Sequence, residues 1–184
     1  KRDWSSDVCS SDLTRIDYVM MTHSHADHGG GIREVAARIP LGTFIDHIPP
    51  TDEAEKNVKG TRTVYDRYLE TGRGKPHIDP TPGARLPLRG VEALVVSANG
   101  VVPSAPLSGG GQTNPACAGA GVPAQENFEN PFSNGLRIQY GRFRFLDVGD
   151  LSGAPLFALG CPVNLVGERL EEHTSELQSR FGIS

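Results

Sequence analysis

The segment MTHSHADHGGG, from Met21 to Gly31, decides how the rest of the sequence is interpreted. Within six positions it places three histidines and one aspartate, namely His23, His25, Asp27 and His28. Neutral imidazoles and carboxylates are the groups that zinc and similar ions bind in proteins. A single histidine is more often a solvated or hydrogen-bonded side chain, but four ligand-type residues at this density predict a metal site.

The residues on either side of the cluster indicate how it is held. Residues 16–21 form an apolar, partly β-branched run that predicts a buried strand, and three glycines follow the cluster. Side chains repeat every second residue in an extended segment, so His23 and His25 can bind one ion together. The glycines lack a Cβ, so the next turn can fold Asp27 and His28 toward a second ion. Two ions ~3.5–4 Å apart can share a hydroxide and polarise a carbonyl or phosphoryl oxygen.

Hydrophobic periodicity predicts mixed helices and strands after the cluster. Gly60 is expected to interrupt the longer helix, and Gly141 to turn a hairpin that has one buried face bearing Phe143 and Phe145. Residues 99–134 are rich in glycine and proline and predict a long loop that is functional or disordered. The expected elements are a helix over 32–39, a strand over 42–46, a helix over 51–69, two strands within 84–98 and a hairpin over 136–147.

Composition bounds the class of protein. The 184 residues, 37% of them hydrophobic, suffice for one globular domain. No apolar run approaches the ~20 residues that a membrane span needs, and the first residues lack the apolar core of a signal peptide. Lys and Arg number 18 against 22 Asp and Glu, so no basic stripe for nucleic acid is present. A small-molecule substrate is therefore expected, and the oligomeric state is left open.

The pattern THSHADHGGG after an apolar strand resembles the H-x-H-x-D-H signature of the metallo-β-lactamase fold hydrolases. The likeness extends over residues 14–168. It implies an α+β fold, the αββα sandwich, with the metal site at one edge of two packed sheets. The cofactors implied are two divalent metal ions, with zinc expected, and the resemblance gives Asp27 a catalytic role in moving protons.

A second stretch, ENPFSNGLRIQYGRFRFLDVGDL over residues 129–151, resembles the part of this superfamily in which a strand delivers an aspartate that bridges the ions. The resemblance places the bridge on Asp150, with Asp147 as its competitor. The likeness is closest to bacterial proteins related to the hydrolase-like domain of DNA-uptake competence proteins. In those proteins an Asn-x-x-Ser pattern replaces a third histidine, and Asn130 and Ser133 fit it.

Several other residues near the predicted strand ends have more than one interpretation. Thr22 either hydrogen-bonds near the metals or simply ends its strand. Asp46 either orients a ligand histidine or caps a turn. His47 lines the substrate pocket, serves as an alternative ligand, or is an ordinary loop residue, whereas His77 is expected on the surface.

Cys117 and Cys161 have two possible states. They form a disulfide in an exported protein or remain free thiols in the cytoplasm. Relatives of the kind that the sequence resembles are often exported, which favours the disulfide and an exported or periplasmic location.

The two ends of the sequence are related at the level of DNA. Residues 3–13 and 171–179 can be encoded by opposite strands of one oligonucleotide, which resembles the adapter used in short-read sequencing. We therefore interpret residues 1–13 and 169–184 as adapter-derived, so Cys9 and His173 take no part in a site. Residues 14–168 are then a partial metallo-β-lactamase-like domain, incomplete at both ends.

This interpretation shapes the expected function. The first strands of the fold, and a histidine ligand expected within a few tens of residues after Asp150, are then missing from the chain. The parent protein is expected to hydrolyse an ester, lactone, amide or phosphodiester, and this chain to be inactive and prone to aggregation at its open sheet edges. The alternative is a metal-binding or interaction module without turnover.

Overall fold

The structure is a computed structural model that describes residues 13–124, 126 and 128–167. The two segments interpreted as adapter-derived lie outside these residues, apart from Leu13, as do Cys9 and His173.

A parallel three-stranded sheet carries the cluster. Its strands β1 (Ile16–Met20), β2 (Leu41–Ile45) and β3 (His77–Ile78) pair in that order. Parallel strands need long crossovers, and these contain the helices α1 (Ala26–Gly29), α2 (Ile32–Ala36), α3 (Asp52–Asn57) and α4 (Thr61–Gly72). Because the strands run the same way, the cluster after β1 and His47 after β2 emerge at the same edge.

An antiparallel sheet brings the second part of the site to this edge. Its strands β4 (Glu92–Ser97), β5 (Gly135–Tyr140) and β6 (Phe143–Asp147) pair in that order. The hairpin register sets Asp147, at the end of β6, opposite Leu136, near the start of β5. The helix α5 (Gly153–Gly160) follows β6, and the 3₁₀ turns η1 (Pro115–Cys117) and η2 (Asn130–Phe132) lie before β5.

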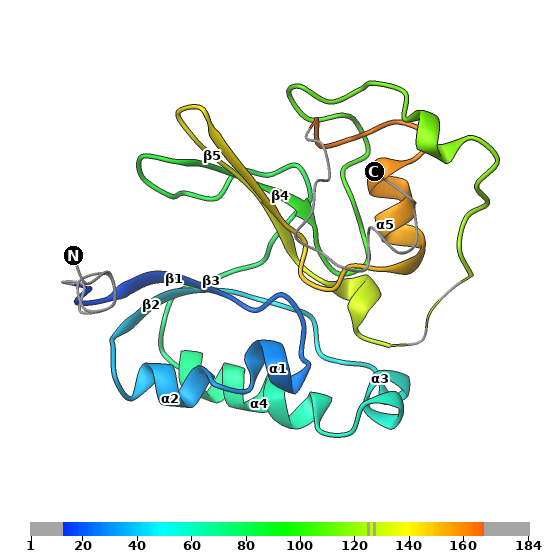
Figure 1. Cartoon of the computed structure of the whole chain (residues 1–184). Coiled ribbons are helices and arrows are strands. Elements are labelled where there is room, and N and C mark those ends of the chain that lie inside the picture. The colour runs from blue at the N-terminus through cyan, green and yellow to red at the C-terminus, as the bar shows by residue number, and fades with distance from the viewer. Residues whose placement is uncertain (1–12, 125, 127, 168–184) are drawn as a thin grey trace, which may run out of the picture.

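Three apolar clusters separate four layers (Figure 1). On β2, Phe44 packs with Tyr68 of α4, and the next residue, Ile45, faces the other sheet and packs with Val95. On β4, Val95 is followed by Val96, which faces α5. This alternation of side chains along each strand places helices, two sheets and a helix in succession. The predicted αββα sandwich is therefore confirmed.

Asn134 joins the two sheets at the edge that carries the cluster. Its Nδ2 donates to the carbonyl oxygens of Met21, at 3.0 Å, and Asp46, at 2.8 Å. Its backbone N–H donates to the carbonyl of Thr22 at 2.8 Å. The side chain is fully buried, so these bonds satisfy carbonyls at the ends of β1 and β2 that water does not reach.

The predicted helices and strands differ from the structure in extent. Gly60 has a φ of 95°, a left-handed conformation that favours glycine, and it divides the predicted helix into α3 and α4 as expected. Residues 84–90 contribute a single bridge, from Arg85 to Leu94, rather than a full strand. The short β3 and the uniformly apolar α5 were not predicted, because neither shows the alternation of polar and apolar residues on which the prediction rests.

The prediction that the hairpin has one buried face is wrong for its outer half. Leu136 and Ile138 pack into the cluster between the sheets, but Tyr140, Phe143 and Phe145 are 65%, 61% and 41% exposed. The hairpin projects past the other layers (Figure 1), and no segment among the described residues covers its tip. Alternation therefore identified the apolar face correctly but not how far the core extends along it.

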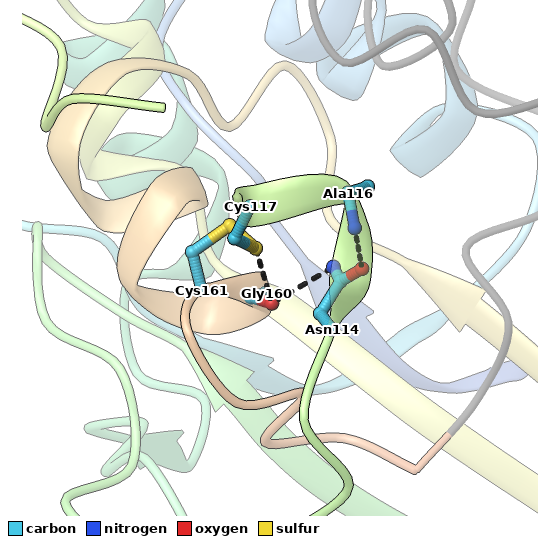
Figure 2. Close-up of a disulfide and its surroundings, with 5 residues drawn as sticks. All are labelled: Asn114, Ala116, Cys117, Gly160 and Cys161. Atoms are coloured by element: carbon cyan, nitrogen blue, oxygen red, sulfur yellow. Dashed lines mark hydrogen bonds between the residues drawn. A yellow bond between two sulfur atoms is a disulfide. The ribbon is translucent and has the colours of Figure 1, made fainter. Parts of the chain in front are cut away.

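The long loop over residues 99–134 is anchored to α5. Cys117 and Cys161 form a disulfide with a Cα–Cα separation of 5.7 Å (Figure 2). Asn114 Nδ2 donates to the carbonyl of Gly160 at 3.0 Å, next to the disulfide. Of the two states open to the cysteines, the disulfide is the one present, and it fixes the middle of the loop to the end of the helix.

The helices are short relative to a bilayer. The longest described helix, α4, has 12 residues and is therefore about 18 Å long, against a hydrocarbon core of about 30 Å. In the part of the chain that the structure describes, no helix has the length and apolar character to cross a membrane.

Replacing Asn134 tests the joint between the sheets. We expect Asn134→Ala to lower the free energy of unfolding by about 2–4 kcal/mol, because two buried carbonyls lose their donor. Urea unfolding measures this, with Gln139→Ala as the control, since that variant removes one exposed amide-to-carbonyl bond to Gly141. The control should change stability by less than about 0.5 kcal/mol. Equal losses in the two variants would contradict the role given to Asn134.

Candidate metal centre

The structure brings Asp150 to two histidines of the cluster. His28 Nε2 lies 3.3 Å from Asp150 Oδ1, and His23 Nε2 lies 3.8 Å from Asp150 Oδ2. One ligand atom from each of these three residues lies within 4.8 Å of the other two. The group therefore has the dimensions of a metal site, and it joins residues more than a hundred positions apart.

His25 and Asp27 each contact one member of this group. His25 Nδ1 is 3.0 Å from His23 Nε2, and Asp27 Oδ2 is 3.7 Å from His28 Nε2. His23 is fully buried, whereas the Asp27 side chain is 80% exposed. The five predicted ligands thus lie together, and their side chains range from fully buried, at His23, to largely exposed, at Asp27. Which ion each would bind stays a prediction.

The segment after His25 forms a short helix rather than the glycine-rich loop expected. His25 is extended, with φ −75° and ψ 154°, and α1 begins at the next residue. Asp27 and His28 therefore lie on a helical turn. A Cβ on Gly29 would lie 2.6 Å from Val64 Cγ1, so this glycine allows α1 to approach α4. Its role is close packing between helices, not an open turn.

Thr22 contacts the outer nitrogens of two ligands. Its hydroxyl oxygen lies 3.3 Å from Nδ1 of His23 and 3.3 Å from Nδ1 of His28. When each Nδ1–H donates to this oxygen, each Nε2 keeps a free lone pair on the side that faces Asp150. A partner on the outer nitrogen is what orients a metal-binding histidine. One hydroxyl therefore sets the tautomer of two rings.

Gly149 lets the turn that carries Asp150 approach Thr22. It has a φ of 55°, and a Cβ there would lie 2.8 Å from Thr22 Cβ. Asp147, the competing bridge, instead accepts from the Gly149 N–H at 2.9 Å through Oδ1. Asp147 therefore shapes the turn, and Asp150 is the carboxylate at the cluster.

Burial keeps His23 neutral. Removal from water and, to a lesser extent, the neighbouring imidazoles of His28, His25 and His47 together lower its pKa from 6.5 to about 3. A neutral imidazole retains the lone pair that a metal ion needs. The site is therefore ready to bind a cation at neutral pH without first losing a proton from this ring.

Two of the weaker assignments are corrected by the structure. His47 is buried, and its ring nitrogens lie 2.7 Å from the Ile48 carbonyl and 3.0 Å from the Phe132 carbonyl. With both nitrogens engaged, it is not available as a metal ligand or a pocket wall. Asp46 does not orient a cluster histidine, because its carboxylate bonds to His77 Nδ1 at 2.8 Å.

His77 lies on the surface, as expected, but it has a structural role. Besides its bond to Asp46, its Nε2 bonds to the Gly72 carbonyl at 3.0 Å, at the end of α4. The hydrogen bond that His77 donates to the Asp46 carboxylate, and after it the bond to the Gly72 carbonyl, raise the pKa of His77.

Asn130 and Ser133 lie on the turn that leads into Asn134. Asn130 Oδ1 and Ser133 Oγ are buried and have no hydrogen-bond partner among the described residues. The turn adjoins the cluster, because the next residue, Asn134, bonds to Thr22. Sequence reasoning missed Glu129 and Asn134, although both stand beside residues that it had singled out.

Comparison with known proteins identifies the family. Residues 10–102, half of the chain, match the Metallo-beta-lactamase superfamily. The chain therefore belongs to this superfamily, whose members bind metal ions and are usually hydrolytic. The matched range contains the whole cluster and extends past β4.

A solved structure is also similar. It is Zn²⁺-bound PqqB from Methylobacterium extorquens, with 17% sequence identity and a TM-score of 0.37. The alignment covers 71% of this chain and 37% of that one, so the chain spans little more than a third of the length of PqqB. Comparison with curated protein sequences finds no match.

Substitution of Thr22 tests its role in orienting the ligands. We expect Thr22→Val to weaken zinc binding about 10–100-fold, because both Nδ1 atoms lose their partner while the volume is kept. Competition with a coloured zinc chelator measures the affinity. Thr22→Ser, which keeps the hydroxyl, should bind zinc nearly as well as the wild type. Wild-type affinity in Thr22→Val would refute the role.

Acid unfolding tests the burial of His23 in the metal-free protein. The folded pKa lies near 3 and the unfolded value near 6.5, so the unfolded chain binds the extra proton between these values. The contribution of His23 to the free energy of unfolding is therefore fully present above pH 6.5 and is lost progressively as the pH falls toward 3. His77 acts in the opposite sense, because its pKa is raised, and its contribution is lost as the pH rises through the folded value.

Urea unfolding across this range, on the wild type and two variants, separates the contributions. His23→Gln should flatten the loss of stability below pH 6.5, and His77→Gln should leave that loss intact. An unchanged acid profile in His23→Gln would contradict the burial argument.

Proposed function

We propose that the protein is a metal-dependent hydrolase whose centre holds two divalent metal ions, with zinc the expected metal. The observation that carries the proposal is the convergence of His23, His28 and Asp150, with one ligand atom from each within 4.8 Å of the others. This convergence occurs at the edge shared by two sheets, in a chain of the Metallo-beta-lactamase superfamily.

The donor set fits two ions. His23 and His25 would hold one, and Asp27 and His28 the other. Asp150 directs Oδ2 toward His23 and Oδ1 toward His28, so its two oxygens face different histidines. This is the orientation that a bridging carboxylate needs. Imidazole and carboxylate donors in this proportion suit zinc.

The residues around the donors support hydrolysis. Bound divalent ions would lower the pKa of a water molecule and polarise a carbonyl or phosphoryl oxygen. Asp27 is exposed and lies beside His28, so it can pass a proton between the site and solvent. Thr22 fixes the rings of His23 and His28, which keeps the donors in place as charge develops.

The proposed substrate is a small molecule with an ester, lactone, amide or phosphodiester bond. The chain has a formal net charge of −4 and therefore lacks the excess of positive charge that is typical of nucleic-acid-binding proteins. The disulfide between Cys117 and Cys161 supports an exported or periplasmic location, because disulfides persist in oxidising compartments.

A second candidate is a metal-binding module without turnover. The observation that favours it is that, in the described part of the chain, one tight group of three ligand residues is found. A single ion on His23, His28 and Asp150 would account for that group. Asn130 and Ser133 would then belong to a binding surface.

Counting bound metal separates the two candidates. We expect two zinc ions per chain by elemental analysis. We also expect the parent protein to hydrolyse a nitrophenyl ester or bis(nitrophenyl) phosphate. One ion and no turnover would favour the second candidate. Asp150→Asn should weaken zinc binding, whereas Asp147→Asn, three residues away, should bind zinc as the wild type does. Equal binding by both variants would contradict the bridge.

A further inference from the structure

His47 has an acceptor at each ring nitrogen. Nδ1 lies 2.7 Å from the carbonyl oxygen of Ile48, and Nε2 lies 3.0 Å from that of Phe132. A carbonyl oxygen only accepts, so both ring nitrogens must carry a proton to make these bonds. A ring protonated at both nitrogens is a cation. A ring that donates to both carbonyls is therefore an imidazolium, here at a residue that is 3% exposed.

Glu129 supplies the opposite charge. Its Oε1 lies 3.5 Å from His47 Nδ1, and the residue is 1% exposed. A buried charge is tolerated when it is paired and hydrogen-bonded. The ring faces two carbonyl acceptors, and Glu129 Oε1, which is buried without a hydrogen-bond partner among the described residues, lies beside it as the counter-charge.

The pair connects three loops at the edge that bears the metal centre. Ile48 follows β2, Phe132 lies in η2, and Asn99 follows β4. The Phe132 carbonyl also accepts from the Asn99 N–H at 3.2 Å, and the Ile48 N–H donates to Asn99 Oδ1 at 3.2 Å. His47 is thus the charged member of a network that holds η2 to both sheets.

The turn from Asn130 to Ser133 is held in part by this network and in part by Ser97, whose hydroxyl donates to the Ser133 carbonyl at 2.9 Å. Its own polar side chains do not hold it, because Asn130 Oδ1 and Ser133 Oγ have no partner among the described residues. His47 fixes it at Phe132, and Asn134 fixes it to Thr22 immediately after Ser133. The turn is therefore positioned from both ends, against the segment that carries His23.

We propose that His47 is a positioning residue, a buried imidazolium paired with Glu129 that holds the turn Asn130–Ser133 against the metal centre. The proposal rests on the proposed function, because the centre that it serves is the metal site proposed above. It assigns His47 no contact with metal or substrate. The positive charge also acts on the site at a distance, in the direction that keeps His23 neutral.

Nuclear magnetic resonance of protein with ¹⁵N-labelled histidine tests the charge directly. The metal-free protein is observed at neutral pH. We expect both ring nitrogens of His47 to be protonated there. A neutral ring, with one proton, would overturn the proposal whatever the metal affinity proves to be.

Cobalt binding tests the positioning. The double variant His47→Met with Glu129→Met removes both charges together, so no unpaired charge stays buried. We expect it to fold, as judged by circular dichroism, and to bind Co²⁺ at least about tenfold more weakly, with an altered absorption spectrum. Wild-type affinity and spectrum in the folded double variant would overturn the proposal.

The matched control is His77→Gln with Asp46→Asn. It removes another histidine–carboxylate pair, whose histidine also bonds to a backbone carbonyl, and it should leave Co²⁺ affinity unchanged. An equal loss in the control would overturn the proposal, because the effect would then be general.

If the double variant does not fold, the single variant Glu129→Gln provides the test instead. It preserves the shape of Glu129 but removes its charge, so we expect His47 to lose one ring proton and Co²⁺ binding to weaken. A ring that stays doubly protonated, with unchanged Co²⁺ affinity, would overturn the proposal. Failure of the wild type to bind any metal would instead refute the proposed function, and with it the positioning role, while the ring protons would still report the charge.

Discussion

The amide side chain of Asn134 holds together the two edges on which the rest of the site depends. Parallel strands end with carbonyl groups that have no partner in their own sheet, and here two of them, Met21 and Asp46, are bonded by one buried amide. The same residue immediately precedes β5, the strand whose hairpin partner β6 leads to Asp150. The joint between the sheets therefore brings the histidine cluster and Asp150 to the same edge, where their side chains lie 3.3–3.8 Å apart.

Three histidines in this chain show how burial and partners decide charge. His23 is enclosed with other imidazoles, and its pKa is lowered to about 3, so it is a neutral donor to a cation. His77 is close to Asp46 and to a helix end, and its pKa is raised. The geometry of His47 gives it two carbonyl acceptors and a carboxylate. The same type of side chain thus serves as a proposed metal ligand at His23, as a surface hydrogen-bonding residue at His77 and, as proposed, as a buried cation at His47.

The parts of the fold and site that follow from local pattern could be predicted from the sequence. The cluster is local, and the preference for Asp150 over Asp147 follows from its place beyond a strand end and next to a glycine. The roles of His47, Glu129 and Asn134 could not be predicted, because they arise from contacts between distant segments. His47 and Phe132, for example, are 85 positions apart. The exposed tip of the hairpin was missed for the same reason, since alternation identifies a face but not what covers it.

The contact between Gly149 and Thr22 bears on how such a centre can be transplanted. A designer who grafts the histidine cluster and the aspartate onto another scaffold transfers the donors but not the clearance between the two loops that carry them. A methyl group at position 149 would fall 2.8 Å from Thr22 Cβ. The new host would then have to separate the loops, and the hydroxyl that aligns two rings would move with them. The smallest unit that can be transferred is therefore the pair of loops in contact. That unit includes Gly149, whose side chain is a single hydrogen atom.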